Sequence, residues 1–340
     1  MSFTMLGSWS KLFSLVFLIC IAHPVCALPK GGQDSNDSKG KATSTAASAS
    51  GTLGQATDGS VILDKTVQIN GLPIRYRISA PADQFTAASG VPGAKADSSQ
   101  AGANGLNVLL HGDGGTSFFD FPNQAVQDGL MGVVVLAPNN KRFWGGGSGL
   151  QRTDGVAHAA AVNSLIQKQL AQDVAFDPSR VFFTGVSGGS LLLSGFFVPA
   201  FGATYKTGVV LNCGALTPQV NVVDSSTLIS KMKIHFQSTQ DELASLQGEL
   251  PRAIAAYESL ATDAGLSADQ IGALQTVDNS PNGGGHCAFD GKDFVSGVQL
   301  IASNYANIIS DNPSGKVPGI KQSVLKSVVG NEKISFSSAT

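Results

Sequence analysis

The stretch Phe182-Phe183-Thr184-Gly185-Val186-Ser187-Gly188-Gly189-Ser190-Leu191-Leu192 decides how this chain folds. It runs from aromatic and β-branched residues through a glycine cluster into a leucine-rich segment. This order predicts a strand that turns sharply into a helix, with Ser187 at the corner. Such a turn needs small neighbours because strand and helix pass close together, and Gly185 and Gly189 supply them. Gly-x-Ser-x-Gly is also common in ordinary turns, so the rest of the chain must show whether Ser187 is a nucleophile.

Short apolar segments alternate with helical ones around this stretch. The pattern predicts strands at 106–110, 132–137, 181–184, 208–211, 233–237 and 271–277. It predicts helices at 125–129, 156–171, 190–197, 243–264 and 294–309. Strands that are apolar on both faces and alternate with helices predict an α/β fold, with a mostly parallel sheet covered on both sides. Two further runs, 61–70 and 72–80, meet at Asn70-Gly71 and predict an N-terminal antiparallel hairpin.

Residues with catalytic chemistry follow several of these strands. His111-Gly112-Asp113-Gly114-Gly115 comes directly after 106–110, Asp241 follows 233–237, and His286 follows the last strand. In such sheets ligands bind beyond the carboxyl ends of the strands. A serine hydroxyl becomes a good nucleophile when an imidazole takes its proton and a carboxylate orients that imidazole. The order glycine loop, Ser, Asp, His is that of α/β-hydrolases, with Ser187 as the expected nucleophile.

Three carboxylates are candidates for the acid of this set. Asp241 would also serve as a helix N-cap, and Glu242 and Asp224 are the alternative carboxylates. The glycine loop can bring backbone N–H groups to a bound carbonyl oxygen, but the carboxylate of Asp113 would oppose a developing negative charge unless it is paired or points away. His111 and Asp113 lack a second histidine at ligand spacing, so we predict no metal site.

The N-terminal residues have the composition of an export signal. Residues 1–27 hold one lysine, an apolar run at 12–21 and small residues before Ala27, which predicts a secretory signal peptide. The apolar run is shorter than the roughly 20 residues that span a bilayer. Residues 28–60 are rich in small and polar types and predict a flexible tail, which leaves 61–340 as the catalytic domain.

Cysteine content and charge limit the partners. Two of the four cysteines leave with the signal peptide, so Cys213 and Cys287 remain and are expected to pair in an oxidising compartment. The net charge of -2, without a basic stripe, argues against nucleic acid. No later segment is long and apolar enough for a membrane span, so we expect a secreted, extracellular protein without membrane contact after signal removal. The oligomeric state is not indicated.

A longer stretch carries a family resemblance. Asp177-Pro178-Ser179-Arg180-Val181-Phe182-Phe183-Thr184-Gly185-Val186-Ser187-Gly188-Gly189 resembles the secreted polyhydroxybutyrate depolymerase and feruloyl or acetylxylan esterase group of α/β-hydrolases. The Leu-His-Gly loop from Leu110 to Gly115, Asp241 and Gly285-His286 match that group in turn. The resemblance covers roughly residues 106 to 290. The chain departs from it in lacking a cysteine beside the nucleophile and in the Thr-Gln-Asp-Glu context of the acid.

The resemblance implies a carboxylic ester hydrolase without a cofactor, acting on a small-molecule or polymer-linked ester. It implies Ser187 as nucleophile, His286 as base and Asp241 as acid. It also implies that the oxyanion donors are the backbone N–H groups of Gly112, Asp113, Gly114 and Gly188.

Aromatic residues near the site raise the question of substrate. Phe118, Phe119 and Trp144 lie in predicted loops after strands and are expected to line an acyl pocket, the alternative being that they pack in the core. Two other functions stay open: a serine peptidase or amidase, and an inactive hydrolase fold used for binding. The sequence shows no propeller or large cap domain, which argues against the first, and the intact Ser, Asp and His argue against the second.

Overall fold

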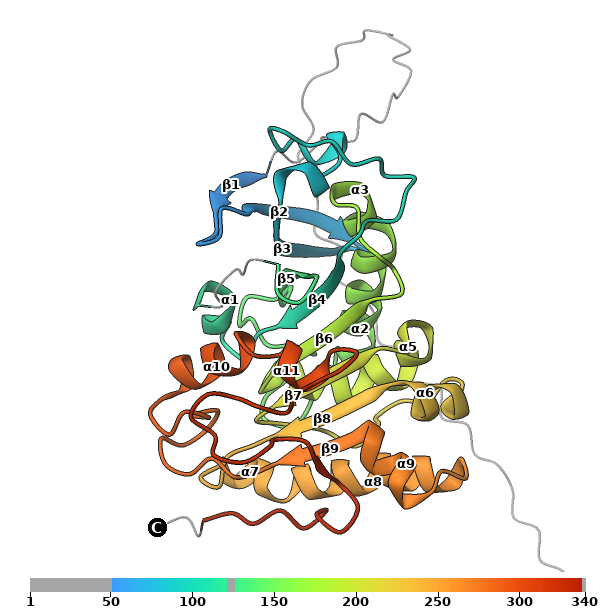
Figure 1. Ribbon diagram of the computed structural model, residues 1–340, viewed down its shortest axis with the longest axis vertical. Coiled ribbons are helices and arrows are strands. Elements are labelled where there is room, and N and C mark those ends of the chain that lie inside the picture. Colours follow the sequence, from blue (N-terminus) through green and yellow to red (C-terminus); the bar gives the residue numbers. More distant parts are fainter. Residues whose placement is uncertain (1–50, 121–125, 338–340) are drawn as a thin grey trace, which may run out of the picture. The chain divides into compact units, whose positions relative to one another are not determined.

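A ten-stranded sheet organises the protein, seen here in a computed structural model that describes residues 51–120 and 126–337 (Figure 1). In spatial order its strands are β1 (Thr52–Gln55), β2 (Val61–Ile69), β3 (Leu72–Ala80), β5 (Leu130–Leu136), β4 (Gly105–Leu110), β6 (Val181–Val186), β7 (Gly208–Asn212), β8 (Lys233–Gln237), β9 (Gln275–Asp278) and β10 (Lys326–Ser327). The six strands from β5 to β9 are parallel, and the outer strands pair antiparallel. This mostly parallel sheet with an antiparallel N-terminal edge confirms the predicted α/β-hydrolase fold.

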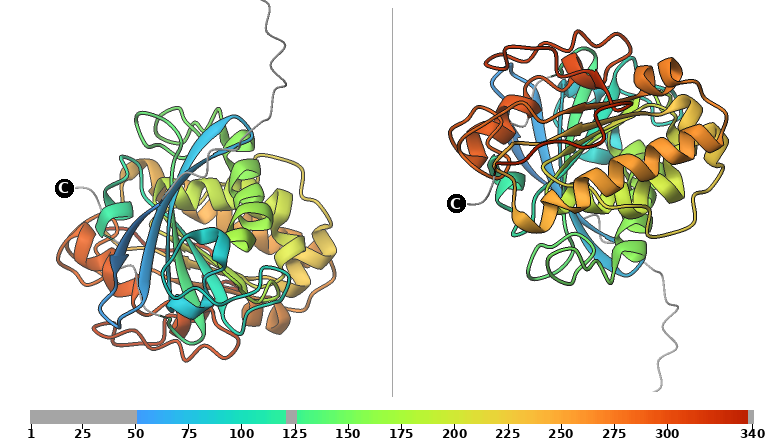
Figure 2. Two further views of the ribbon diagram at one scale, coloured as in Figure 1. Left: turned by 90° about the horizontal axis from the view of Figure 1, so that it is seen from above. Right: turned by 90° about the horizontal axis from the view of Figure 1, so that it is seen from below.

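Helices cover both faces of the sheet, as the two views of Figure 2 show. One face carries α2 (Gly155–Ser164), its continuation η3 (Leu165–Leu170) and α3 (Ala171–Asp173), then α4 (Gly188–Leu192), η4 (Leu193–Phe197), α5 (Val198–Tyr205), α6 (Ser225–Lys231), α7 (Ala244–Gln247), α8 (Glu249–Asp263) and α9 (Ala268–Leu274). The other face carries α1 (Thr116–Asp120), α10 (Phe294–Ala302) and α11 (Ala306–Ile309). Among the described helices, none has the length and apolarity needed to cross a membrane.

The core consists of two apolar clusters, one on each side of the sheet. Val108 and Leu110 of β4 belong to the larger cluster under α2, α5 and α8, while Leu109 belongs to the smaller one under α10 and α11. Of the β6 residues, Phe183 belongs to the larger cluster and Phe182 to the smaller one. Successive side chains of a strand point to opposite faces, so strands buried on both sides must be continuously apolar. This explains why the apolar runs predicted a sheet covered by helices.

The N-terminal hairpin confirms its prediction. Strands β2 and β3 pair in register from Val61↔Ala80 to Ile69↔Leu72. Asn70 and Gly71 form the turn, both at positive φ, 52° and 79°. Two consecutive residues at positive φ match the right-handed twist of the flanking strands, which is why Asn-Gly is the preferred sequence there.

Several predicted elements were wrong. Residues 268–274 form α9 where a strand was predicted from 271, and only 275–278 are extended. The predicted helix 125–129 is instead a turn over 126–129 with a single bridge, Gln127↔Leu130, and residue 125 lies outside the described residues. Within the predicted flexible tail, 28–60, residues 52–55 form β1, which pairs with β2.

The rest of the N-terminal predictions are not tested. Residues 28–50 of the predicted tail and the predicted signal peptide, 1–27, lie outside the described residues.

Candidate active site

Ser187 lies at a sharp turn between β6 and α4. Its backbone has φ 49° and ψ -113°, a region that residues with side chains rarely adopt. The turn is supported by Asn212 at the end of β7, whose carbonyl accepts the Ser187 N–H at 2.8 Å. A Cβ on Gly189 would lie 2.2 Å from the Leu110 carbonyl oxygen, and one on Gly185 would lie 2.6 Å from Ser190. Both glycines are therefore required by close backbone approach, as the sequence predicted.

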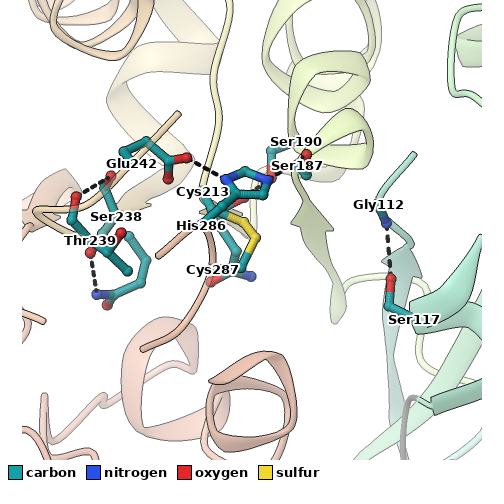
Figure 3. Close-up of a disulfide and its surroundings, with 12 residues drawn as sticks. Gly112, Ser117, Ser187, Ser190, Cys213, Ser238, Thr239, Glu242, His286 and Cys287 are labelled. Atoms are coloured by element: carbon teal, nitrogen blue, oxygen red, sulfur yellow. Dashed lines mark hydrogen bonds and ion pairs between the residues drawn. A yellow bond between two sulfur atoms is a disulfide. The ribbon is translucent and has the colours of Figure 1, made fainter. Parts of the chain in front are cut away.

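A chain of hydrogen bonds runs from Ser187 to a buried carboxylate (Figure 3). The Ser187 hydroxyl lies 3.0 Å from Nε2 of His286, and Nδ1 of His286 contacts the carboxylate of Glu242. Glu242 is only 4% exposed. With Nδ1–H donated to Glu242, Nε2 is left as the acceptor for the serine proton. This is the geometry that activates a serine hydroxyl.

The structure corrects the predicted acid. The partner of His286 is Glu242, whereas the carboxylate of Asp241 accepts the N–H of Gly283 at 2.6 Å. Asp224, the other alternative, caps α6 through the N–H of Thr227. The carboxylate of Glu242 is held by the N–H of Leu243 at 2.8 Å. Asp241 therefore stabilises the loop that carries His286, and Glu242 orients the imidazole ring of His286.

The predicted pairing of Cys213 with Cys287 is present as a disulfide. It joins the residue after β7 to the residue after His286, and both cysteines are fully buried (Figure 3). The hydroxyl of Thr239 donates to the Gly285 carbonyl at 3.1 Å on the other side of the same loop. The two sulfurs and His286 lie within 4.8 Å of one another, but sulfurs bonded to each other offer no thiolate for a metal.

Two of the four predicted oxyanion donors are already hydrogen-bonded within the protein. The N–H of Gly112 donates to the Ser117 hydroxyl at 2.9 Å, and that of Gly114 donates to the Arg142 carbonyl at 3.1 Å. Gly188 is the first residue of α4, so its N–H has no partner within the helix. The N–H of Asp113 has no hydrogen-bond partner among the described residues. The donors available for an oxyanion are therefore those of Gly188 and Asp113.

The carboxylate of Asp113, unexplained by the sequence, forms a bidentate ion pair with Arg152. Both oxygens accept guanidinium N–H groups at 2.8 Å. A paired carboxylate removes the conflict between this side chain and a negative charge in the site.

His111 has a structural role in the same loop. Its Nε2 accepts the N–H of Ala137 at 2.9 Å, and its Nδ1 donates to the carbonyl of Gly112 at 2.5 Å. Burial lowers the pKa of His111 to about 4, so the ring is neutral at physiological pH. With both nitrogens occupied, His111 offers no free ligand atom to a metal.

Of the three aromatic residues predicted to line the acyl pocket, two lie in the core and one lies at the surface. Phe118 and Trp144 are fully buried in the core, so their assignment to the pocket was wrong. Phe119 is 45% exposed. The residue that sequence reasoning missed is Phe294, the half-buried first residue of α10. Its ring centroid lies 6.0 Å from that of His286, and its Cζ would lie 3.3 Å from a Cβ on Gly112.

A hollow of about 560 Å³ lies beside the His286 loop. Its lining includes Pro281, Asn282 and Phe289 together with residues 319–322 of the C-terminal segment. None of Ser187, His286 and Glu242 lines it. Phe294 does not line it either, so this hollow is distinct from the region around the serine hydroxyl.

Comparisons with known proteins give only distant likenesses. No protein-family model matches the chain, and no curated protein matches it. Among solved structures, it is similar to a thermostable esterase (16% identity, TM-score 0.41), covering 59% of this chain and 52% of that one. It is also similar to a ferulic acid esterase (13% identity, TM-score 0.42), covering 72% of this chain and 96% of that one. A third likeness is to the AtxE2 isopeptidase (12% identity, TM-score 0.44), covering 75% of this chain and 41% of that one. The chain thus spans about half the length of the thermostable esterase. Likenesses this distant transfer no activity to the chain.

Proposed function

We propose that this protein is a serine hydrolase that cleaves carboxylic esters through an acyl-enzyme. The observation that carries the proposal is the hydrogen-bonded chain from the Ser187 hydroxyl through His286 to the buried Glu242. A strained turn holds Ser187 in place, and two backbone N–H groups, of Gly188 and Asp113, are available beside it. Nucleophile, base, orienting acid and oxyanion donors are the groups that acyl transfer requires.

The reaction follows from this geometry. As Ser187 Oγ attacks the ester carbonyl carbon, its proton passes to Nε2 of His286, and Glu242 stabilises the imidazolium. The N–H groups of Gly188 and Asp113 stabilise the oxyanion. When the intermediate collapses, the bond to the alcohol oxygen breaks and the alcohol takes the proton from Nε2. Water then attacks the acyl-enzyme with His286 as base, and the carboxylic acid leaves Ser187 free.

Phe294 suggests where the substrate binds. Its half-buried ring lies close to both His286 and the loop at Gly112. An aromatic wall at this point suits an apolar or aromatic acyl group, in a small ester or at the surface of a polymer. Phe119, exposed in α1 directly after this loop, remains a candidate.

The same triad would also cleave amides, so a peptidase or amidase is the main rival. A hydrolase fold used only for binding is the other. Turnover of p-nitrophenyl esters against peptide anilides separates the first rival from our proposal. Labelling by a fluorophosphonate, which reacts only with an activated serine, separates the second.

The direct test is an acyl-group scan with the purified protein. p-Nitrophenyl acetate, butyrate and octanoate and methyl ferulate are assayed with the wild type, Ser187→Ala and a control, Ser179→Ala, in an exposed turn before β6. We expect turnover of at least one ester, a loss of at least about 10³-fold in Ser187→Ala, and none in the control. Full activity in Ser187→Ala would refute the proposal.

We further propose that the protein is secreted. The composition of residues 1–27 supports this, and so does the buried Cys213–Cys287 disulfide, since disulfides persist mainly in oxidising compartments. Expression of the whole chain in a secretory host, followed by N-terminal sequencing of the exported protein, tests it. We expect a new N-terminus near Leu28; retention inside the cell with an intact N-terminus would contradict secretion.

A further inference from the structure

A buried guanidinium lies behind the oxyanion loop. Arg152 is 2% exposed at its side chain and holds both oxygens of Asp113, whose side chain is 23% exposed. The same guanidinium donates to the carbonyls of Trp144 at 2.9 Å and of Gly149 at 2.7 Å. Four hydrogen bonds fix the position of this planar guanidinium. Lysine cannot replace arginine here, because an ammonium group does not donate in the same planar, bidentate arrangement.

The carboxylate of Asp113 lies directly against the nucleophile turn. A Cβ on Gly188 would be 2.0 Å from Oδ1 of Asp113, closer than any real side chain allows. Gly188 is also the residue whose N–H is proposed to hold the oxyanion. An unpaired carboxylate at this place would accept that N–H and would repel the negative charge that develops on the substrate.

Gly145 and Trp144, in the segment before Arg152, pack closely against their surroundings. Gly145 has φ 73°, and a Cβ there would lie 2.7 Å from the Cβ of Arg152. The N–H of Gly145 donates to Nδ1 of His158 at 2.8 Å, and the ring of Trp144 lies 5.4 Å from that of His111. The segment that packs against Arg152 is therefore tied to α2 through His158 and to the oxyanion loop through His111.

We propose that Arg152 is a positioning residue for the oxyanion site, which neutralises Asp113 and keeps its carboxylate away from the N–H of Gly188. This inference rests on the proposed function, because it concerns the charge that forms during ester cleavage. It predicts that losing the guanidinium lowers kcat, because an unpaired carboxylate is left beside the N–H of Gly188. It also predicts that removing this carboxylate in the same protein reverses part of the loss.

The test compares Arg152→Gln with the double variant that also carries Asp113→Asn. We expect Arg152→Gln to lower kcat by about 10²-fold with KM changed less than about threefold, the size of losing one oxyanion donor. Adding Asp113→Asn, which removes the unpaired carboxylate but keeps the backbone N–H, should restore kcat by at least about tenfold. Binding of a phenylboronate, which forms a tetrahedral anion on the serine, should weaken in parallel with kcat.

Controls separate this inference from folding and from the proposed function. Thermal unfolding midpoints report whether each variant folds. Arg252→Gln, which removes the exposed guanidinium paired with the buried Glu249 on α8, should leave kcat unchanged. If Arg152→Gln does not fold, Arg152→Lys takes its place. It keeps the positive charge but loses the bidentate hydrogen bonding, so its kcat should fall by less than the loss of about 10²-fold expected for Arg152→Gln.

No recovery of kcat in the double variant would show that the pair is only structural and would overturn the inference alone. A wild type that neither hydrolyses esters nor reacts with a fluorophosphonate would instead overturn the proposed function, and this inference with it.

Discussion

Glu242 and Asp241 are adjacent carboxylates whose side chains point in different directions. Glu242 reaches His286, while Asp241 binds the backbone of Gly283. Ser187 and His286 could be predicted from the sequence because each stands in a glycine-rich turn after a strand. The acid could not, because both carboxylates follow the same strand and only the loop backbone decides which one meets the imidazole.

The two acids should therefore differ in catalysis. We expect Glu242→Gln to lower kcat for p-nitrophenyl butyrate by about 10²- to 10⁴-fold, because the imidazole loses the group that fixes its tautomer. Asp241→Asn is the matched control and should stay within about fivefold of wild type. The reverse ranking would assign the acid to Asp241 and contradict the hydrogen bonding described here.

Phe294 should affect the choice of acyl group. Phe294→Ala is expected to raise KM for methyl ferulate by about tenfold, since it removes an aromatic wall beside His286, with a smaller effect on p-nitrophenyl acetate. Val295→Ala, at the exposed next position of α10, serves as the control. Steady-state kinetics on both esters measure the effect, and an equal rise in KM for the two would place Phe294 outside the acyl site.

At the level of elements, the predicted strand at 271–277 was wrong in its first half because a local helix-capping signal was overlooked. Ile271 begins an apolar run that is typical of a buried strand, but it lies in α9, where its side chain is buried. The signal that was missed is the capping box of Ser267 and Gln270, which starts a helix before that run. β10 pairs with β9 over only two residues, so its sequence carries no periodicity to detect.

The disulfide joins two elements of the site and should matter for stability. Cys213→Ala with Cys287→Ala opens a link between residues 74 apart, for which loop-closure entropy predicts a loss of about 4 to 5 kcal/mol in the free energy of unfolding. Urea unfolding at fixed pH measures it. We also expect lower kcat, since the link holds the residue next to His286. Unchanged stability would mean that packing alone fixes the loop.

At the level of the whole molecule, the two apolar clusters account for both the success and the limits of sequence reasoning. Continuous apolar strands predicted a sheet buried on both faces, and the clusters on its two sides confirm this. Phe118 and Trp144 were wrongly assigned to the pocket, because an aromatic residue in a loop gives no sign of whether it faces inward or outward. Only the packing of α1 and of the loop after β5 decides that.

Buried histidines should make the fold sensitive to mild acid. Burial lowers the pKa of His111 to about 4, and it also lowers those of His158 and His235. Between about pH 6.5 and pH 4 the unfolded chain binds protons that the folded protein does not, so stability falls as pH falls through this window. For His111 we expect a loss of about 2 kcal/mol between pH 7 and pH 5.

Urea unfolding at pH 7, 6 and 5 tests this, with His111→Gln as the matched variant. The variant should be less stable at pH 7 and should show a shallower decline toward pH 5. A free energy of unfolding that does not change between pH 7 and pH 5 would contradict neutral burial of these rings.

We expect Ser187, activated by His286 and Glu242, to become acylated during ester cleavage. Rapid acid quenching of the protein with p-nitrophenyl butyrate, followed by peptide mass spectrometry, detects the acyl group. We predict one butyryl group on the peptide that contains Ser187, and none in Ser187→Ala. Hydrolysis that leaves this peptide unmodified and persists in Ser187→Ala would contradict the claim.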